Sequence, residues 1–217
     1  MNAGKFVTVA LVATCAFALA ACDSGSSETK PSPPINSSTI PPSGTSPAPF
    51  PERSMGNEGQ KYRPASEKGP AENVPLPEFS DKAKVNSPDG AKAFIEYYAE
   101  LINYVAETND TQEIKKYTSR NCKECAVSII DPADYSKSID EWVVGGEYEF
   151  HIIDTYQPKK SNAIITTIFT SKPFKTYQDP GKVIGEYSEV SETYGTFQVE
   201  FKNGWKVVEF LVEDNQS

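Results

Sequence analysis

The spacing of apolar residues predicts a long amphipathic helix in the middle of the chain. Between residues 87 and 108, apolar side chains recur at intervals of three and four, as they do on one face of a helix. That face comprises Ala91, Phe94, Ile95, Tyr98, Leu101, Ile102 and Val105. Ser87-Pro88 is a typical start, because serine can cap free N–H groups and proline suits the first helical turn. Asn109-Asp110 is expected to end the helix.

Shorter helices are predicted next, and strands follow them. Thr111 should cap a helix over residues 112–117, a third helix should cover 122–130 and stop at Pro132, and a short turn should occupy 133–139. After Trp142 the apolar period becomes two, which predicts strands over 147–156, 163–170, 183–190, 195–201 and 205–212. Asn203-Gly204 is a strong hairpin signal, and Gly145-Gly146 is expected to form a tight turn before the first strand.

This order of elements predicts the fold class. Helices followed by antiparallel hairpins are typical of an α+β domain, so we expect N-terminal helices packed on a curved antiparallel sheet of about four to six strands. The arrangement resembles the cone-shaped fold of proteins similar to nuclear transport factor 2. The resemblance concerns architecture alone.

The first residues have the layout of an export signal. Lys5 is followed by an apolar run over residues 6–20, shorter than the roughly 20 residues of a membrane-spanning helix. The run ends in Leu19-Ala20-Ala21-Cys22, which resembles the lipobox of bacterial lipoproteins. The resemblance implies a signal peptide over residues 1–21 and a lipid with palmitate-type acyl chains on Cys22, which would anchor the protein to a membrane. An ordinary secretory signal with a chance cysteine is the alternative.

Residues 22–77 have the composition of a disordered linker. Ser, Pro, Thr, Gly and Asn dominate, and isolated apolar residues such as Ile35 and Phe50 follow no regular period. Such a segment buries too little apolar surface to offset its conformational entropy. Glycosylation of the linker, or recognition of its prolines by a partner, stays open.

Residues 78–217 are predicted to form one domain, a usual size for a single core. The whole chain carries a formal net charge of −9, so its surface should not attract nucleic acid, and we expect no nucleic-acid partner. This region contains several short motifs: Pro77-Glu78-Phe79, Gly90-Ala91-Lys92-Ala93-Phe94, Leu101-Ile102-Asn103-Tyr104, Thr108-Asn109-Asp110, Cys122-Lys123-Glu124-Cys125 and Gly145-Gly146. Together they resemble a domain of unknown function at the C-terminus of many actinobacterial lipoproteins. The resemblance supports location and fold and implies no activity.

Cys122 and Cys125 form the sharpest motif of this domain. Outside the cytoplasm such a pair usually oxidises, which favours a structural disulfide. A redox dithiol is a second interpretation, but it expects a strand directly before the motif, where a helix is predicted. Metal binding is a third, although the chain offers a single histidine as a further nitrogen ligand.

That histidine, His151, lies on a predicted strand. Tyr98, His151, Asp154 and Tyr156 are candidate cavity residues, because cone-shaped folds host enzymes whose acid and base line a cavity. On a regular strand, however, His151 and Asp154 point to opposite faces, which disfavours a catalytic pair. A surface histidine and core tyrosines are the alternative interpretation.

The sequence favours binding over catalysis. It contains no phosphate-binding loop, no dinucleotide fingerprint and no Gly-x-Ser-x-Gly elbow, so we expect no cofactor and no metal. We expect an extracytoplasmic, lipid-anchored, non-enzymatic binding or interaction module of the cell envelope, with a protein, glycan or small ligand as its partner. The alternative is a small cavity enzyme (a hydrolase, isomerase or dehydratase) that uses His151 with a carboxylate. An inward-facing His151 would favour the enzyme.

Overall fold

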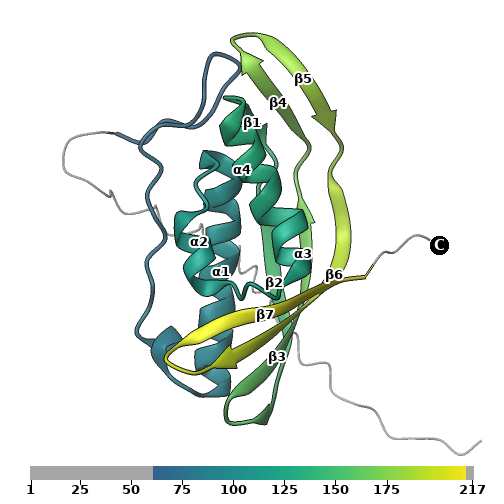
Figure 1. Ribbon diagram of the computed structural model, residues 1–217. Helices are drawn as coiled ribbons and strands as arrows, with labels where there is room; N and C mark the ends of the chain where they lie inside the picture. Colours follow the sequence, from purple (N-terminus) through teal and green to yellow (C-terminus); the bar gives the residue numbers. More distant parts are fainter. Residues whose placement is uncertain (1–60, 214–217) are drawn as a thin grey trace, which may run out of the picture. The chain divides into compact units, whose positions relative to one another are not determined.

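The computed structural model describes residues 61–213 of the chain. Its helical segments are η1 (Lys82–Lys84), α1 (Pro88–Thr108), α2 (Gln112–Tyr117), α3 (Lys123–Cys125), the π-helical turn η2 (Ala126–Ile130) and α4 (Asp131–Ser138). The strands that follow are β1 (Trp142–Gly145), β2 (Tyr148–Lys159), β3 (Asn162–Ser171), β4 (Phe174–Asp179), β5 (Lys182–Tyr187), β6 (Val190–Phe201) and β7 (Trp205–Val212). Helices followed by antiparallel strands confirm the predicted α+β class (Figure 1).

Helix α1 forms where the apolar period predicts it. At its start, the Ser87 hydroxyl accepts a hydrogen bond of 3.0 Å from the backbone N–H of Gly90. At its end, Asn109 adopts the left-handed conformation with a φ of 55°. Every residue of the predicted apolar face is buried. The ring of Tyr98 meets that of Phe197 on β6 with centroids 6.0 Å apart, so the helix and the larger sheet share one core.

The helical path between Cys122 and residue 138 differs from the prediction. Pro132 does not stop a helix; it lies in the first turn of α4, directly after η2. In η2 the N–H of Asp131 donates to the carbonyl of Ala126, five residues back. This wider turn accommodates Pro132 within a continuous helical path, because a proline ring clashes with the carbonyl four residues before it in a regular α-helix and has no N–H to donate.

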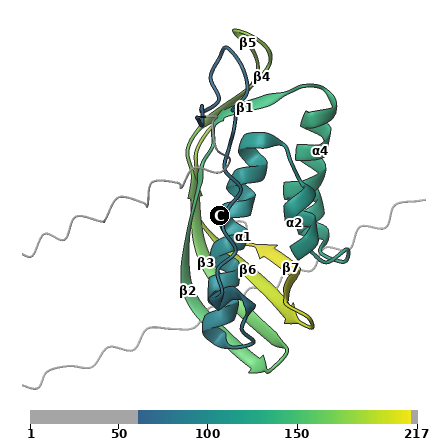
Figure 2. The ribbon, with the colours of Figure 1, turned by 90° about the vertical axis from the view of Figure 1, so that its left-hand side faces the viewer.

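The strands form two antiparallel sheets where one was expected. The smaller sheet has the order β1-β4-β5 and the larger one β2-β3-β6-β7. Each strand of the smaller sheet continues into a strand of the larger through two residues, namely 146–147, 172–173 and 188–189. The two sheets are therefore successive parts of one ribbon, interrupted at a bend (Figures 1 and 2).

The bend has a local cause. Gly145 and Gly146 have φ values of +87° and +78°, which L side chains rarely adopt. Pro173, in the β3–β4 link, has no N–H for a strand ladder. Gly145-Gly146 thus does not precede the first strand, as expected, but joins β1 to β2.

The larger sheet follows its sequence pattern closely. Strand β3 buries every second side chain, including Ile165, Thr167 and Phe169. Strands β6 and β7 form the predicted hairpin, in which the N–H of Lys202 donates to the carbonyl of Gly204 over 3.2 Å. Figure 2 shows α1 between the strands β2 and β3 and the helices α2 and α4.

The prediction of a disordered linker up to residue 77 is wrong for residues 61–77. Arg63 and Glu72 exchange two backbone hydrogen bonds of 2.9 Å. The Trp142 indole donates to the carbonyl of Ser66 over 2.8 Å, and the N–H of Gly181 donates to that of Glu67 over 2.7 Å. This segment is ordered by contacts with β1 and the β4–β5 turn, which its own composition does not reveal.

Other predictions concern parts of the chain outside the described residues. These are the signal peptide over residues 1–21, lipidation of Cys22 and the linker over residues 22–60. Between residues 61 and 213, no helix combines the length and apolar character required to cross a bilayer.

Candidate functional site

A cavity of about 400 Å³ lies at the bend, between α1, the η2–α4 segment and both sheets. Its inner wall is formed by the buried side chains of Ile102, Val105, Phe169 and Phe210. This volume falls in the range of pockets for small molecules, roughly 300 to 1,000 Å³. The cavity is therefore the candidate site for a ligand.

Aromatic rings form much of the cavity wall outside these four residues. Phe174 stacks on Tyr187 with ring centroids 4.4 Å apart, and Phe150 lies 5.2 Å from Phe169. Burial raises the pKa of the Tyr148 phenol above its ordinary value, which keeps that hydroxyl neutral. The wall thus offers apolar surface with a few hydroxyl groups.

Asn103 fixes this wall to helix α1. Its side-chain amide donates to the carbonyl of Tyr148 over 2.9 Å, and its side-chain oxygen accepts from the N–H of the same residue over 2.8 Å. The Asn103 side chain therefore pairs with the backbone of Tyr148, the first residue of β2, as a neighbouring strand would. The sequence showed Asn103 only as part of a family motif.

One end of the cavity is polar. Glu141, between α4 and β1, is held there by two neighbours that also line the cavity. The Asn109 side-chain amide donates to the backbone carbonyl of Glu141 over 2.7 Å. The Ser136 hydroxyl donates to Oε2 of the Glu141 carboxyl over 3.2 Å. A carboxyl, a hydroxyl and an amide therefore converge on an otherwise largely apolar space.

Tyr98 is a core residue and does not line this cavity. Its hydroxyl lies 2.8 Å from the Thr118 hydroxyl, which donates to the carbonyl of Ile114. Burial raises the pKa of Tyr98 to about 12, and the hydrogen bond with Thr118 opposes part of this shift. The assignment of Tyr98 to a cavity is wrong.

His151, Asp154 and Tyr156 are exposed and do not line the cavity either. Strand β2 contains a β-bulge at Ile153, because Ile152 pairs with Thr167 whereas Asp154 pairs with the adjacent residue of β3. The extra residue brings His151 and Asp154 to the same face, whereas a regular strand would separate them. That face is the outer one, so their assignment to a cavity is wrong.

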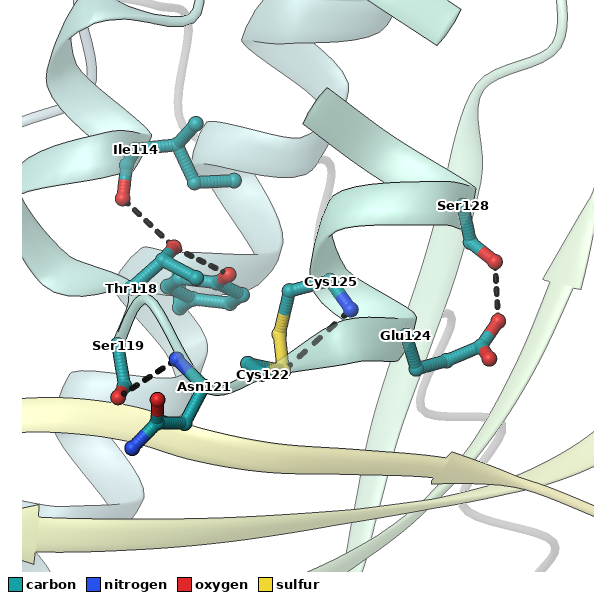
Figure 3. Close-up of a disulfide and its surroundings, with 9 residues drawn as sticks. Ile114, Thr118, Ser119, Asn121, Cys122, Glu124, Cys125 and Ser128 are labelled. Atoms are coloured by element: carbon teal, nitrogen blue, oxygen red, sulfur yellow. Dashed lines mark hydrogen bonds between the residues drawn. A yellow bond between two sulfur atoms is a disulfide. The ribbon is translucent and has the colours of Figure 1, made fainter. Parts of the chain in front are cut away.

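Cys122 and Cys125 form a disulfide with a Cα–Cα distance of 5.3 Å (Figure 3). Both residues are buried, with 3% and 0% of their surface exposed. Redox-active cysteines need access to a partner thiol, so burial favours the structural interpretation. Among residues 61–213, no group of His, Cys, Asp and Glu side chains could hold a metal ion.

The disulfide lies where several elements meet. Cys122 Sγ accepts a hydrogen bond of 3.3 Å from the N–H of Cys125, and the N–H of Ser119 donates to the carbonyl of Val207 on β7 over 2.8 Å. The helical path then leads directly through η2, whose Ser128 and Ile129 line the cavity. The disulfide therefore fixes the start of one cavity wall.

Comparison with known proteins gives a family and distant structural likenesses. A sequence model of a family of unknown function, DUF6318, matches residues 60–210. No curated protein matches the chain. The intermembrane space region of the chloroplast protein ARC6 is 10% identical, with a TM-score of 0.43, over 58% of this chain and 95% of that one. A domain of unknown function with a cystatin-like fold from Nostoc punctiforme is 10% identical, with a TM-score of 0.38, over 59% and 79%.

Proposed function

As the chain belongs to the family of unknown function DUF6318, we propose its role from its own residues: a lipid-anchored, extracytoplasmic module that binds a small apolar ligand without catalysis. The observation that carries the binding role is the cavity of about 400 Å³ at the bend. We also propose that α1 and the bent strands form the cone-shaped arrangement of domains similar to nuclear transport factor 2. The contact between Tyr98 and Phe197 and the double hydrogen bond of Asn103 support this architecture.

Binding is favoured over catalysis by the position of the ionisable groups. The enzyme alternative required His151 and a carboxylate inside a cavity, and His151 is on the outer face of β2. Of the residues between 61 and 213 that line the cavity, only Glu141 has an acidic or basic side chain. General acid–base chemistry on a ligand there would lack a second ionisable partner of matched pKa.

The apolar probe N-phenyl-1-naphthylamine tests the binding role, since its fluorescence rises in an apolar environment. We would use the chain from residue 22 with Cys22→Ser, which avoids detergent. The expected result is saturable binding that Ile129→Trp weakens at least about tenfold, because a larger side chain fills the cavity. Val127→Trp is the matched control: it lies on the same turn, is 60% exposed and does not line the cavity.

Two outcomes would contradict the proposal. One is the absence of saturable probe binding to the folded chain. The other is equal weakening by Ile129→Trp and Val127→Trp, which would place the probe outside the cavity.

The anchor is supported by Leu19-Ala20-Ala21-Cys22 and the apolar run before it. Several acyl chains hold a protein stably at a membrane, at roughly 0.8 kcal/mol per buried CH₂. The test is membrane fractionation of the full chain with and without Cys22→Ala, together with mass spectrometry of the N-terminal peptide. An unmodified Cys22 in the membrane fraction would refute the anchor.

A further inference from the structure

The cavity has an electrostatic asymmetry that restricts its ligand. Among the described residues that line the cavity, Glu141 contributes the one acidic or basic side chain, and none of them is a lysine, an arginine or a histidine. Nearby lysines already pair with acids on the helices. The Lys115 ammonium lies 2.6 Å from the Asp134 carboxyl, and that of Lys137 lies 4.0 Å from Asp110. A ligand carboxylate or phosphate would therefore be buried beside Glu141 without a cation.

The carboxyl of Glu141 can accept hydrogen bonds from a ligand. An ionised carboxylate has about four acceptor sites on its two oxygens. The Ser136 hydroxyl donates to Oε2, and within the described part of the chain nothing donates to Oε1. The Asn109 amide donates to the backbone carbonyl of Glu141 and so fixes the residue without using its carboxyl. The site thus presents an acceptor at one end of an aromatic cavity.

We propose that the ligand is an apolar molecule whose head group is a hydrogen-bond donor, uncharged or cationic, and that Glu141 selects it against anions. This inference rests on the proposed binding role and adds the class of ligand. An amine would gain both a hydrogen bond and an ion pair with the carboxylate, and an alcohol would gain the hydrogen bond alone. An anion would gain neither and would meet a like charge.

Three compounds with the same tail test the selection: decylamine, 1-decanol and decanoate. Each competes with N-phenyl-1-naphthylamine for the chain from residue 22 with Cys22→Ser at neutral pH. Decylamine should displace the probe at a concentration at least about tenfold below that of decanoate, with 1-decanol between them, since a charge-assisted hydrogen bond contributes more than a neutral one. This comparison requires no cavity variant, so it does not depend on the folding of one.

Glu141→Gln then identifies the selecting group. It keeps the shape of the side chain and removes its charge, so the preference for decylamine over decanoate should fall to within about threefold, because the hydrogen bond loses its charge assistance. Glu149→Gln, on the exposed face of β2, removes the same charge from the chain and should keep the full preference.

The outcomes separate this inference from the proposed function. If the probe itself does not bind saturably, the proposed binding role is refuted; if it binds but 1-decanol and decylamine both fail to displace it, the binding role stands and the ligand class proposed here is refuted. If they displace it but decanoate does so equally well, binding stands and the selection by Glu141 is refuted. An equal loss of preference in Glu141→Gln and Glu149→Gln would assign the effect to the overall charge of the chain and would also overturn the inference.

Discussion

Replacement of Asn109 should change the stability of the fold by two separable effects. The residue ends α1 at a φ of 55° and ψ of 20°, and its side-chain amide donates to the backbone carbonyl of Glu141 at the polar end of the cavity. Both Asn109→Gly and Asn109→Ala remove the donor from the Glu141 carbonyl, which costs about 1–2 kcal/mol for a partly buried group. Asn109→Gly also removes the β-carbon that asparagine holds in the left-handed region and so recovers roughly 1 kcal/mol, whereas Asn109→Ala keeps a β-carbon there.

The expected order of the free energy of unfolding is therefore wild type, then Asn109→Gly, then Asn109→Ala, with a loss of about 1–2 kcal/mol for alanine and a smaller one for glycine. Urea unfolding followed by the fluorescence of the two buried tryptophans, Trp142 and Trp205, measures it. Asp140 supplies the control, because it has a φ of 56°, is exposed, and has no hydrogen bond through its side chain in the described structure. Asp140→Ala leaves a β-carbon where aspartate already has one and removes no hydrogen bond, so it should change stability by no more than about 0.5 kcal/mol.

Two results would refute this reasoning. If Asn109→Ala unfolds within about 0.5 kcal/mol of the wild type, as ordinary surface substitutions do, the hydrogen bond to Glu141 contributes nothing measurable. If Asn109→Ala and Asp140→Ala lose equal stability, the loss comes from the backbone conformation alone. In either case the polar end of the cavity would not be held by Asn109.

Three further predictions concern the bend, the disulfide and the core. Gly145→Ala should lower stability by at least about 2 kcal/mol, since its φ is +87° and a β-carbon would lie 2.6 Å from a backbone carbonyl oxygen. Gly181→Ala, at a φ of +74° with open space around it, should cost about 1 kcal/mol. Equal shifts in melting temperature for the two variants would refute the role of the close contact at Gly145. The Cys122→Ser/Cys125→Ser double variant should lose about 2 kcal/mol in urea unfolding, the entropic value for a short loop, and unchanged stability would exclude a structural role. Burial raises the Tyr98 pKa from 10.0 to about 12. The neutral phenol therefore contributes up to about 3 kcal/mol to the free energy of unfolding; this contribution is complete below pH 10 and is lost as the pH rises from 10 to 12. Wild type should therefore lose more stability than Tyr98→Phe over that interval, and parallel curves would contradict the shift.

The elements that could be predicted are those in which one local signal decides the structure. Helix α1 has an apolar face over its whole length, a capping serine and a terminating asparagine, and all three act as predicted. Strand β7 has the predicted bounds, because alternating residues follow the Asn203-Gly204 turn. In both cases neighbouring residues along the chain contain the whole physical cause.

The start of the ordered region could not be predicted in this way. Residues 61–77 contain few apolar side chains and four prolines, so composition indicates disorder. The segment is ordered by hydrogen bonds to distant groups, such as the Trp142 indole and the N–H of Gly181. Only the folded β1-β4-β5 sheet places those donors together. The residues of the segment itself therefore do not indicate that it is ordered.

Asp154 and Tyr156 were misplaced because a single extra residue reverses the faces of a strand, whereas His151 precedes that residue and lies on the exposed face that regular alternation gives it. In β2 the alternation up to Ile152 is regular, and the bulge at Ile153 then shifts the remaining residues by one. Both isoleucines suit a strand, so the sequence does not mark which residue is unpaired. His151, Asp154 and Tyr156 consequently share the exposed face, although regular alternation would have divided them between the two faces.

The cavity itself contains one feature that the sequence could have revealed. Asparagine after a helix with a strong apolar face is expected in the left-handed conformation, which turns the chain back toward the helix. At Asn109 this conformation, together with burial, directs the side-chain amide to Glu141, thirty-two residues farther along the chain. The residues that define the proposed ligand preference therefore come from the end of a helix and from a short loop, and neither position has a repeating pattern. For that reason the period of apolar residues does not predict sites built at the ends of elements, whereas it does predict the core between those elements.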